Sequence, residues 1–467
     1  MSRIGRPVAI AILALLVAAG LLWRLVGERA APGPAALNVV FVVVDMIRAD
    51  RLSACGYGRP TSPVLAALAG ERGASFTCRA YTPGTWTLPS HASFFTGEEV
   101  PVHGADGVLD PRGVETVSLW GDHVRPLPDR FPTLAERMSE RGYLSVMVSG
   151  NPVVSSWSAT GLARGFEVIR ESRQFGDTYG DRLLEVLREA LDEADRRAAG
   201  RPLFLFLNIC DAHHPWDAVP PGLGWLPPRV AIDNRPRDPR NPYARFWRGE
   251  LSEPELRMFL ELIDDSYDHA VWRADRNLGR ALDILAERGV LGPDHRLVVT
   301  SDHGEYLGEH DLLSHATFVY EEDTRVPLWF RERRGGETVP GPALPEPVAA
   351  LAAHDLALHG ALPSPRRPVR AAGYPDGLMS RLFGERLRAT TAAWWDEERK
   401  LFWKNGRFGL FDLAADPREQ SLLPLPADDP LRPAFEAFVG QVEAAGRRET
   451  EPTPQMMEAL RELGYVE

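Results

Sequence analysis

The sequence has 467 residues and a formal net charge of −12 at pH 7, with 44% hydrophobic and 9% aromatic residues. This length allows two to four domains, and the apolar content is enough for a large buried core, which excludes a disordered chain. The acidic balance argues against a nucleic-acid partner, because such binding depends on a basic face.

The chain begins with Arg3 and Arg6, followed by an almost unbroken apolar run over residues 8–23. As a helix, residues 8–26 would be about 28 Å long, close to the ~30 Å hydrocarbon core of a bilayer. This segment predicts an uncleaved membrane anchor, although a cleaved secretory signal has the same plan and stays open. Positively charged residues that flank a membrane span usually stay on its cytoplasmic side, here Arg3 and Arg6. Either interpretation therefore predicts that the rest of the chain lies outside the cytoplasm, in the bacterial periplasm or at the cell surface.

From residue 38 onwards, short apolar runs alternate with helical patterns. Buried strands are predicted at 39–44, 144–149, 203–209 and 297–300, and helices at 181–197 and 266–288. This alternation predicts an α/β fold around a largely parallel sheet.

Two proline-rich stretches interrupt this pattern. Residues 219–243 carry seven prolines and predict a long loop outside the core, of the kind that forms lids or binding loops. A second stretch, at about 334–370, precedes a C-terminal part with strand-like pieces at 392–403 and 408–413 and a terminal helix. We therefore expect an anchor or signal segment with its tether at 1–37, a catalytic domain at 38–345 and a smaller C-terminal part at 346–467.

The three cysteines are too few for a disulfide scaffold or for paired zinc knuckles, and their odd number leaves at least one thiol unpaired. Cys55 and Cys78 could pair outside the cytoplasm, but two plain buried thiols are an equal alternative.

Acidic and histidine side chains follow two of the predicted strands. Asp45 ends the run VVFVVV, and Asp302 with His303 ends the run LVVTS. In an open α/β sheet, ligands gather at the carboxyl ends of the strands. Carboxylates with a neutral imidazole are suitable ligands for Zn, Mn or a Ca-like ion, so these three residues are candidate metal ligands. Each aspartate taken alone could equally be a turn or cap residue.

Thr87 lies two residues before Pro89, and the helix-like run 90–96 follows. Proline marks the first turn of a helix, where free N–H groups and the helix dipole favour an alkoxide or a tetrahedral anion. A neighbouring metal ion would lower the pKa of the hydroxyl and make Thr87 a candidate nucleophile. The simpler interpretation is that Thr87 or Ser90 is only an N-cap.

Histidines follow a further strand in FLFLNICDAHHPW. Because neighbouring residues of an extended chain face opposite sides, we expect one of His213 and His214 to be functional and the other structural. His315 stands twelve residues beyond His303, and taken alone it is more typical of a surface histidine.

These motifs together resemble an ordered series that characterises the sulfatase family of the alkaline phosphatase superfamily. The resemblance covers about residues 38–467 and runs through NVVFVVVDMIRAD, TLPSHASFFTG, GYLSVMVSGN, NICDAHHPW, SYDHAVWRADRNLGRALDIL, VVTSDHGEYLGEHDLLSH, RVPLWF, KNGRFGLFDLAADPREQSLL and LRELGYVE. It implies an alkaline-phosphatase-like α/β sandwich, with a central mostly parallel sheet flanked by helices and a smaller C-terminal α+β domain.

The resemblance also implies roles for single residues. Asp45, Asp302 and His303 would bind one divalent metal ion, and Thr87 at the nucleophile position would also contact it. His213 would bind the substrate oxyanion or protonate the leaving oxygen. His315 matches the position of a Lys or His that holds the tetrahedral group. The implied reaction is in-line attack by Thr87 on a sulfate or phosphate ester.

Two departures from the family pattern limit this picture. Sulfatases use C-x-P-x-R or S-x-P-x-R, whose first residue becomes formylglycine, whereas this chain has Thr87 there and His91 in place of the arginine. Threonine cannot give the aldehyde hydrate. In addition, Met46 follows Asp45 where the family commonly has a second acid, and the smaller number of carboxylates favours Zn or Mn over Ca.

The first interpretation is therefore a membrane-tethered or exported metal-dependent hydrolase. The second is a transferase that moves a phosphoethanolamine-type or glycerol-phosphate-type head group through a Thr87-linked intermediate. Such transferases usually carry several membrane spans and this sequence predicts at most one, so the hydrolase is preferred. The third is a binding protein that kept the fold and the metal but lost the chemistry.

Overall fold

The computed structural model describes residues 37–108, 116–119, 122–232, 238, 240–375 and 377–446. The described residues from Asn38 onwards belong to one compact unit. The predicted anchor or signal segment lies outside the described residues, and none of the described helices is both long enough and apolar enough to cross a bilayer.

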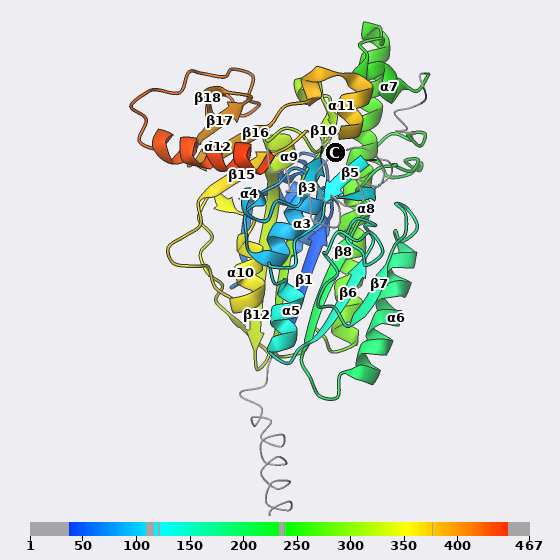
Figure 1. Ribbon diagram of the computed structural model, residues 1–467. Helices are drawn as coiled ribbons and strands as arrows, with labels where there is room; N and C mark the ends of the chain where they lie inside the picture. Colours follow the sequence, from blue (N-terminus) through cyan, green and yellow to red (C-terminus); the bar gives the residue numbers. More distant parts are fainter. Residues whose placement is uncertain are drawn as a thin grey trace, which may run out of the picture. The chain divides into compact units, whose positions relative to one another are not determined.

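The described residues form a central sheet in which most neighbouring strands are parallel (Figure 1). Strand β12 is antiparallel to its neighbours, and the short strand β13 (Glu337–Val339) pairs with its end. The order across the sheet is β14 (Val348–Ala349), β2 (Ser75–Tyr81), β12 (Arg325–Arg334), β9 (His295–Thr300), β1 (Asn38–Val44), β8 (Leu203–Ile209), β6 (Leu144–Ser149) and β7 (Val168–Glu171).

Helices cover both faces of this sheet (Figure 1). One face carries α2 (Pro63–Ala69), α6 (Asp181–Arg197) and α8 (Glu253–Glu287), and the other carries α3 (Thr87–Thr96), α5 (Leu134–Glu140) and α10 (Ala352–His359). The strands β1, β8 and β6 are buried along their whole length on both faces, apart from the first residue of β1. Their nearly continuous apolar sequences are what such burial requires. The predicted α/β class is confirmed.

A second, antiparallel sheet lies toward the C-terminus and contains β15 (Val369–Gly373), β16 (Thr391–Asp396), β17 (Arg399–Lys404) and β18 (Arg407–Asp412). Helix α12 (Arg432–Gly446) packs against it through Phe435, Phe438 and Val442. The strand-like piece predicted at 392–403 is two strands, because the polar residues at 397–398 form a tight turn. The sequence LRELGYVE lies outside the described residues.

Most of the predicted elements coincide with the observed ones. β6, β8 and α6 have the expected bounds, whereas β9 begins at His295 rather than at 297. The largest difference is α8, which begins at Glu253 rather than at 266. A capping box between Ser252 and Glu255 starts the helix there, and Pro254 in its first turn is compatible with that start.

The remaining described elements are short. They are α4 (Val100–His103), α7 (Pro242–Trp247), α9 (Glu321–Thr324), α11 (Gly377–Phe383), β3 (Asp106–Val108), β4 (Val117–Leu119), β5 (Asp122–Arg125), β10 (Tyr306–Leu307), β11 (Leu313–Ser314) and the 3-10 turns Ala49–Arg51, Ser53–Cys55, Glu309–Asp311 and Glu385–Leu387.

The proline-rich loop folds back on itself instead of joining the sheet. Trp216 pairs with Ile232 and Val219 with Arg229 through isolated bridges, and the Arg229 guanidinium is 2.7 Å from the Asp265 carboxylate on α8. The middle of the loop is therefore held against α8 by this ion pair. Residues 233–237 and 239 of this stretch lie outside the described residues.

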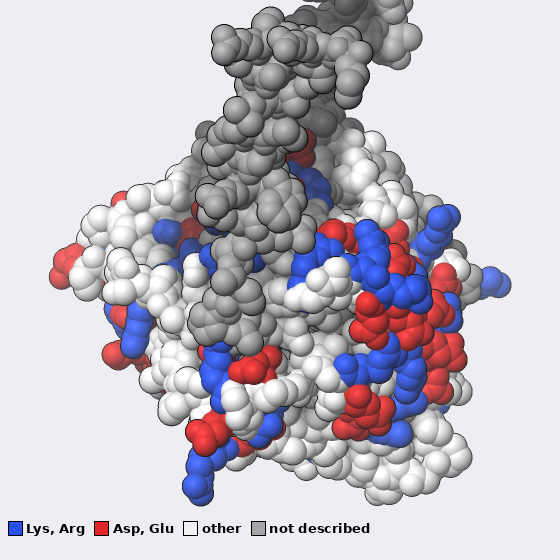
Figure 2. Space-filling model, turned by 90° about the horizontal axis from the view of Figure 1, so that it is seen from below, with Lys and Arg blue, Asp and Glu red and all other residues white. Residues whose placement is uncertain are grey.

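Cys55 and Cys78 form a disulfide, which joins the 3-10 turn Ser53–Cys55 to β2. The third cysteine, Cys210, is buried and free, and its sulfur accepts a hydrogen bond from the Tyr179 hydroxyl. Figure 2 shows acidic and basic side chains in mixed groups on the face drawn there. Acidic and basic side chains also pair directly, as in the ion pairs Arg170–Glu193 and Arg288–Asp192.

Candidate active site

The carboxyl ends of β1 and β9 bring three of the predicted metal ligands together. Val43 of β1 lies opposite Thr300 of β9, so Asp45 and the pair Asp302 and His303 leave neighbouring strands at the same level. One ligand atom from each of these three residues lies within 4.8 Å of the other two. All three side chains are completely buried.

The His303 ring is oriented by its own loop. Its Nδ1–H donates to the Gly304 carbonyl over 2.9 Å, which leaves Nε2 with a lone pair. The His303 Nε2 atom is 3.5 Å from Asp302 Oδ2 and 3.9 Å from Asp45 Oδ1. A lone pair and two carboxylate oxygens therefore face one another.

The outer oxygen of each carboxylate is already satisfied. Asp45 Oδ2 accepts from the side-chain amides of Asn151 and Asn208, over 2.7 and 3.2 Å, and Asp302 Oδ1 accepts from two backbone N–H groups. The inner oxygens, Asp45 Oδ1 and Asp302 Oδ2, are buried and have no hydrogen-bond donor. Because buried polar atoms normally find a partner, the inner pair fits a cation.

The charges of the site point the same way. Burial and the neighbouring Asp45 carboxylate raise the pKa of Asp302 well above its usual value, and burial lowers the pKa of His303. A cation among these groups would favour the ionised aspartates and leave the neutral imidazole as its ligand.

Thr87 is the first residue of α3 and not its N-cap, which is Trp86. Its Oγ1 is 3.4 Å from His303 Nε2 and accepts a 3.1 Å hydrogen bond from the Asn151 amide. The hydroxyl therefore lies beside the three candidate ligands at the positive end of α3, as the sequence predicts. Gly84 lies directly against the first turn of α3, because a Cβ there would lie 2.8 Å from the Pro89 side chain.

His91, which stands where the resemblance predicts an arginine, cannot supply the charge of an arginine. Its Nδ1–H donates to the Thr87 carbonyl over 2.9 Å, and its ring is surrounded by Phe94, Phe95 and Phe206. Burial lowers the pKa of His91 to about 4, so the ring is neutral at pH 7. Its contacts hold the first turn of α3 in place.

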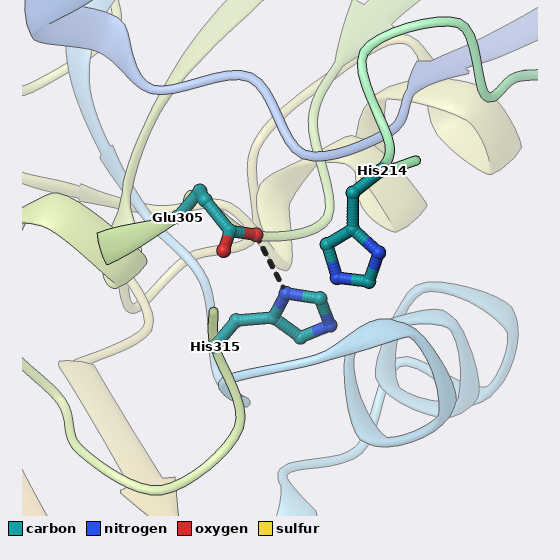
Figure 3. Close-up of side chains that lie close together, drawn as sticks. All are labelled: His214, Glu305 and His315. Carbon is teal, nitrogen blue, oxygen red and sulfur yellow. Dashed lines mark hydrogen bonds and ion pairs between the residues drawn. The ribbon is translucent and has the colours of Figure 1, made fainter. Parts of the chain in front are cut away.

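A second group, which we call the histidine cluster, consists of His214, Glu305 and His315 (Figure 3). His315 Nδ1 is 2.9 Å from Glu305 Oε2, and the His214 ring faces His315 at 5.9 Å between centroids. The ring of His315 is 4.3 Å from that of His303, so the cluster adjoins the metal ligands. Burial raises the pKa of Glu305 to about 7 and lowers that of His214 to about 4.

His213 borders this cluster. Its ring stacks on Phe175 at 4.0 Å and is 5.6 Å from His315, and its Nδ1–H donates to the His214 carbonyl. Its Nε2 is thus left with a lone pair. Burial lowers the pKa of His213 well below its usual value.

The sequence predicts that His213 and His214 face opposite sides, and this prediction is wrong. Residues 211–215 form a turn instead of an extended strand, so the alternation of faces does not apply, and both His213 and His214 approach His315.

Asn151, Asn208 and Glu305 were not predicted as members of the site, and His214 was named only as the alternative to His213. Asn151 stands two residues after the strand that ends at Ser149, and the strand-end rule used for Asp45 would have found it. Glu305 lies in the same short segment as His303. No local signal in the sequence distinguishes it from a surface glutamate.

Comparisons with known proteins show the family and the fold of the chain. The family model described as Sulfatase matches residues 37–343. An uncharacterized sulfatase, YidJ of Escherichia coli K12, is 33% identical over 276 residues, which cover 54% of this chain and 44% of that protein. The phosphatidylethanolamine transferase Mcr-2 of Escherichia coli is 23% identical over 62% of this chain and 48% of that protein. The chain thus spans about half the length of the curated relatives it matches.

Among solved structures, the phosphonate monoester hydrolase of Agrobacterium radiobacter has a TM-score of 0.59 and 18% identity, and the match covers 90% of this chain and 97% of that one. At this identity the likeness shows the fold alone.

Proposed function

The chain belongs to the sulfatase family, and from this premise we propose that it is a metal-dependent hydrolase of sulfate or phosphate esters with Thr87 as nucleophile. The observation that carries the proposal is the position of the Thr87 hydroxyl, 3.4 Å from the unprotonated nitrogen of His303 and beside two buried carboxylates.

The residues present fit one divalent cation. Asp45 Oδ1, Asp302 Oδ2, His303 Nε2 and Thr87 Oγ1 would hold it, and this set of one nitrogen and three oxygens with two charges suits Zn or Mn. When bound, such an ion lowers the pKa of a coordinated hydroxyl and withdraws charge from the oxygens of the transferred group.

Side chains of the site carry out the proposed reaction in two steps. The Thr87 oxygen attacks the phosphorus or sulfur atom and the bond from that atom to the ester oxygen breaks. The Thr87 hydroxyl releases its proton to solvent, and the leaving oxygen takes up a proton that Nε2 of His213 has first received from solvent. Water next attacks the same atom, breaks its bond to Thr87 and returns a proton to the Thr87 oxygen. Asn151 holds Thr87 in place, and the histidine cluster binds the oxygens of the transferred group.

The charge of the site selects the substrate. Two aspartates balance one divalent cation, the buried histidines are neutral, and Arg48, which contacts the same loop, is already paired with Asp50 and Glu309. A monoanionic ester therefore fits better than a dianionic phosphate monoester. Without formylglycine, a sulfate on Thr87 cannot leave by elimination, so phosphodiesters and phosphonate monoesters rank above sulfate esters.

A head-group transferase is the second candidate, and the similarity to the phosphatidylethanolamine transferase Mcr-2 favours it. The first half of the reaction would be identical. An acceptor alcohol would replace water in the second half.

We also propose that the protein is tethered to a membrane through residues 8–26, with the catalytic part outside the cytoplasm. The Cys55–Cys78 disulfide supports this location, since such bonds persist in oxidising compartments.

The test uses the full-length chain in detergent, loaded with Zn or Mn, and four aryl substrates: a phosphodiester, a phosphonate monoester, a sulfate and a phosphate monoester. We expect the fastest turnover of the first two and a loss of at least about a thousandfold in kcat for Thr87→Ala. The matched control is Thr96→Ala at the other end of α3, which should retain activity.

Wild-type activity in Thr87→Ala would refute the nucleophile assignment. Bound metal without turnover of any substrate would favour the binding protein. Product distributed to an added alcohol in preference to water would favour the transferase.

A further inference from the structure

A buried lysine lies at the junction between the C-terminal sheet and the loop that follows the metal ligands. Lys400 of β17 is completely buried, and its Nζ is 2.6 Å from Glu419 Oε1 and 3.6 Å from Glu321 Oε1. A third group of possible metal ligands, His310, Glu322 and Glu419, lies here as well. Since the Lys400 ammonium already contacts Glu419, the protein itself supplies the positive charge of this group.

Glu419 uses its two oxygens to join different parts of the molecule. Oε1 faces Lys400, and Oε2 accepts a 2.7 Å hydrogen bond from the backbone N–H of Glu321, the first residue of α9. Glu419 has φ 51°, a left-handed conformation that few residues other than glycine adopt. This backbone turns the carboxylate inward, toward the lysine.

The side chain of Glu321 attaches α9 to both sheets. Its carboxylate accepts from Trp395 Nε1 over 2.7 Å and from the Tyr81 hydroxyl over 2.9 Å. Trp395 also lies beneath the ammonium of Lys400, at 4.7 Å from the ring centre. Helix α9 is thus held in position from the C-terminal sheet.

The carbonyl groups of α9 in turn hold the loop of the metal ligands. Asp323 O accepts from Gly304 N over 2.6 Å, and Glu322 O accepts from Glu305 N over 3.1 Å. The fit is close, because a Cβ on Gly304 would lie 2.0 Å from Glu322 O. Gly304 is the residue whose carbonyl fixes the His303 ring.

We propose that Lys400 is a positioning residue for the metal centre, an inference that rests on the metal-dependent function proposed above. Its ammonium offsets the charge of the buried Glu419 carboxylate and lies 3.6 Å from that of Glu321, and these two glutamates hold α9 in the place where its carbonyls orient Gly304. Without that charge, Glu419 and Glu321 would repel each other in a buried setting, and α9 would shift. A continuous path of contacts thus joins Lys400 to the metal centre. It runs from Lys400 to Glu419, from Glu419 to Glu321 in α9, from the carbonyls of α9 to Gly304, and from Gly304 to His303.

The experiment compares the full chain with its Lys400→Met variant by two measurements. Hydrogen–deuterium exchange of the metal-free protein follows peptides that contain Gly304 and Glu305. Competition with a chromophoric chelator gives the Zn²⁺ dissociation constant. We expect Lys400→Met to accelerate exchange of these amides at least tenfold and to raise the dissociation constant at least tenfold.

Two controls separate positioning from general loss of stability. Val442→Ala makes a cavity in the core between α12 and the C-terminal sheet and has no contact with the path. Lys404→Met removes another lysine of β17, whose Nζ lies over Phe318. Both should keep wild-type exchange at Gly304 and Glu305 and wild-type Zn²⁺ affinity.

The proposal fails if Lys400→Met behaves as wild type, or if Val442→Ala produces the same two changes at an equal loss of melting temperature. Should Lys400→Met not fold, Glu419→Gln replaces it, because the amide keeps an acceptor for Glu321 N but loses the charge, and it should give the same changes in smaller size. If the wild type binds no Zn²⁺, the metal centre is refuted, whereas exchange in the metal-free protein still decides the role of Lys400.

Discussion

Asn151 is the residue whose contacts most directly join the metal ligands to the nucleophile. Its Nδ2 donates one proton to Asp45 Oδ2 and the other to Thr87 Oγ1, and its Oδ1 accepts from Val153 N, which fixes the orientation of the amide. Asn208 donates to the same Asp45 oxygen but makes no hydrogen bond to Thr87. The two asparagines therefore separate support of the metal from orientation of the nucleophile.

We expect Asn151→Ala to lower kcat about 10- to 100-fold, because the Thr87 oxygen loses the hydrogen bond that aims it. Asn208→Ala is the matched variant and should weaken metal affinity by a similar factor while kcat at saturating metal changes less. Steady-state kinetics over a range of metal concentrations measures both. Equal losses of kcat in the two variants would contradict this role for Asn151.

The strand-end residues Asp45, Asp302 and His303 could be predicted because a buried parallel strand is recognisable as an apolar run, and its next residue lies at the binding edge. His214 and Glu305 could not be predicted in this way. They face His315 only because the chain turns at 211–215 and because α9 fixes the loop after His303, and both effects depend on contacts between distant segments.

At the scale of elements, α8 shows how the sequence pattern underestimates a helix. Its buried residues are concentrated from Asp265 onwards and its first turns are more exposed, although Leu256, Phe259 and Ile263 already follow the helical period. The helix nevertheless begins at Glu253 through its capping box. Strands such as β6 and β8 were predictable to the residue because they are buried on both faces.

Asp275 of α8 holds the start of α2, since its carboxylate accepts from Val64 N and Leu65 N over 2.8 and 2.9 Å. Burial raises its pKa from 3.8 to about 6. A carboxyl group that binds its proton more tightly when folded stabilises the protein fully below pH 4, and that contribution is lost as the pH rises to about 6.

We therefore expect the free energy of unfolding of wild type, relative to Asp275→Asn, to fall by about 2–3 kcal/mol between pH 4 and pH 6.5. Urea unfolding of the two proteins at several pH values measures it. A difference that stays constant, or that increases with pH, would show that burial does not control this group.

Gly304 is the point at which β9, α9 and the candidate site meet. Gly304→Ala places a methyl group against a backbone carbonyl that cannot move independently, so we expect a loss of roughly 2–4 kcal/mol in the free energy of unfolding and weaker metal binding. Gly440→Ala in α12 is the control, since open space surrounds that position and alanine favours a helix. Denaturant unfolding should give opposite signs for the two variants.

At the scale of the whole molecule, the disulfide makes a testable contribution to stability. The Cys55–Cys78 bond closes a loop with a sequence separation of 23 residues, for which chain entropy predicts about 3 kcal/mol. We expect reduction, or the Cys55→Ser/Cys78→Ser double variant, to lower the free energy of unfolding by about this amount. Guanidinium unfolding with and without reductant measures the difference.

Titration of thiols in the denatured protein provides the control for that experiment. One thiol, that of Cys210, should react before reduction and three should react afterwards. Three reactive thiols before reduction would contradict the pairing, and with it one support for a location outside the cytoplasm.

The complete burial of Asp45, Asp302 and His303 has a consequence for timing. A cation held by side chains without access to solvent can exchange only when the surrounding loops open, and such openings are rare in a closely packed interior. We therefore expect the ion to be acquired as the chain folds and then to be retained for long periods. The metal content of the freshly isolated protein would in that case record the compartment in which it folded, and the metal-free and Zn²⁺-loaded samples described above would need long incubation with chelator or metal before exchange is complete.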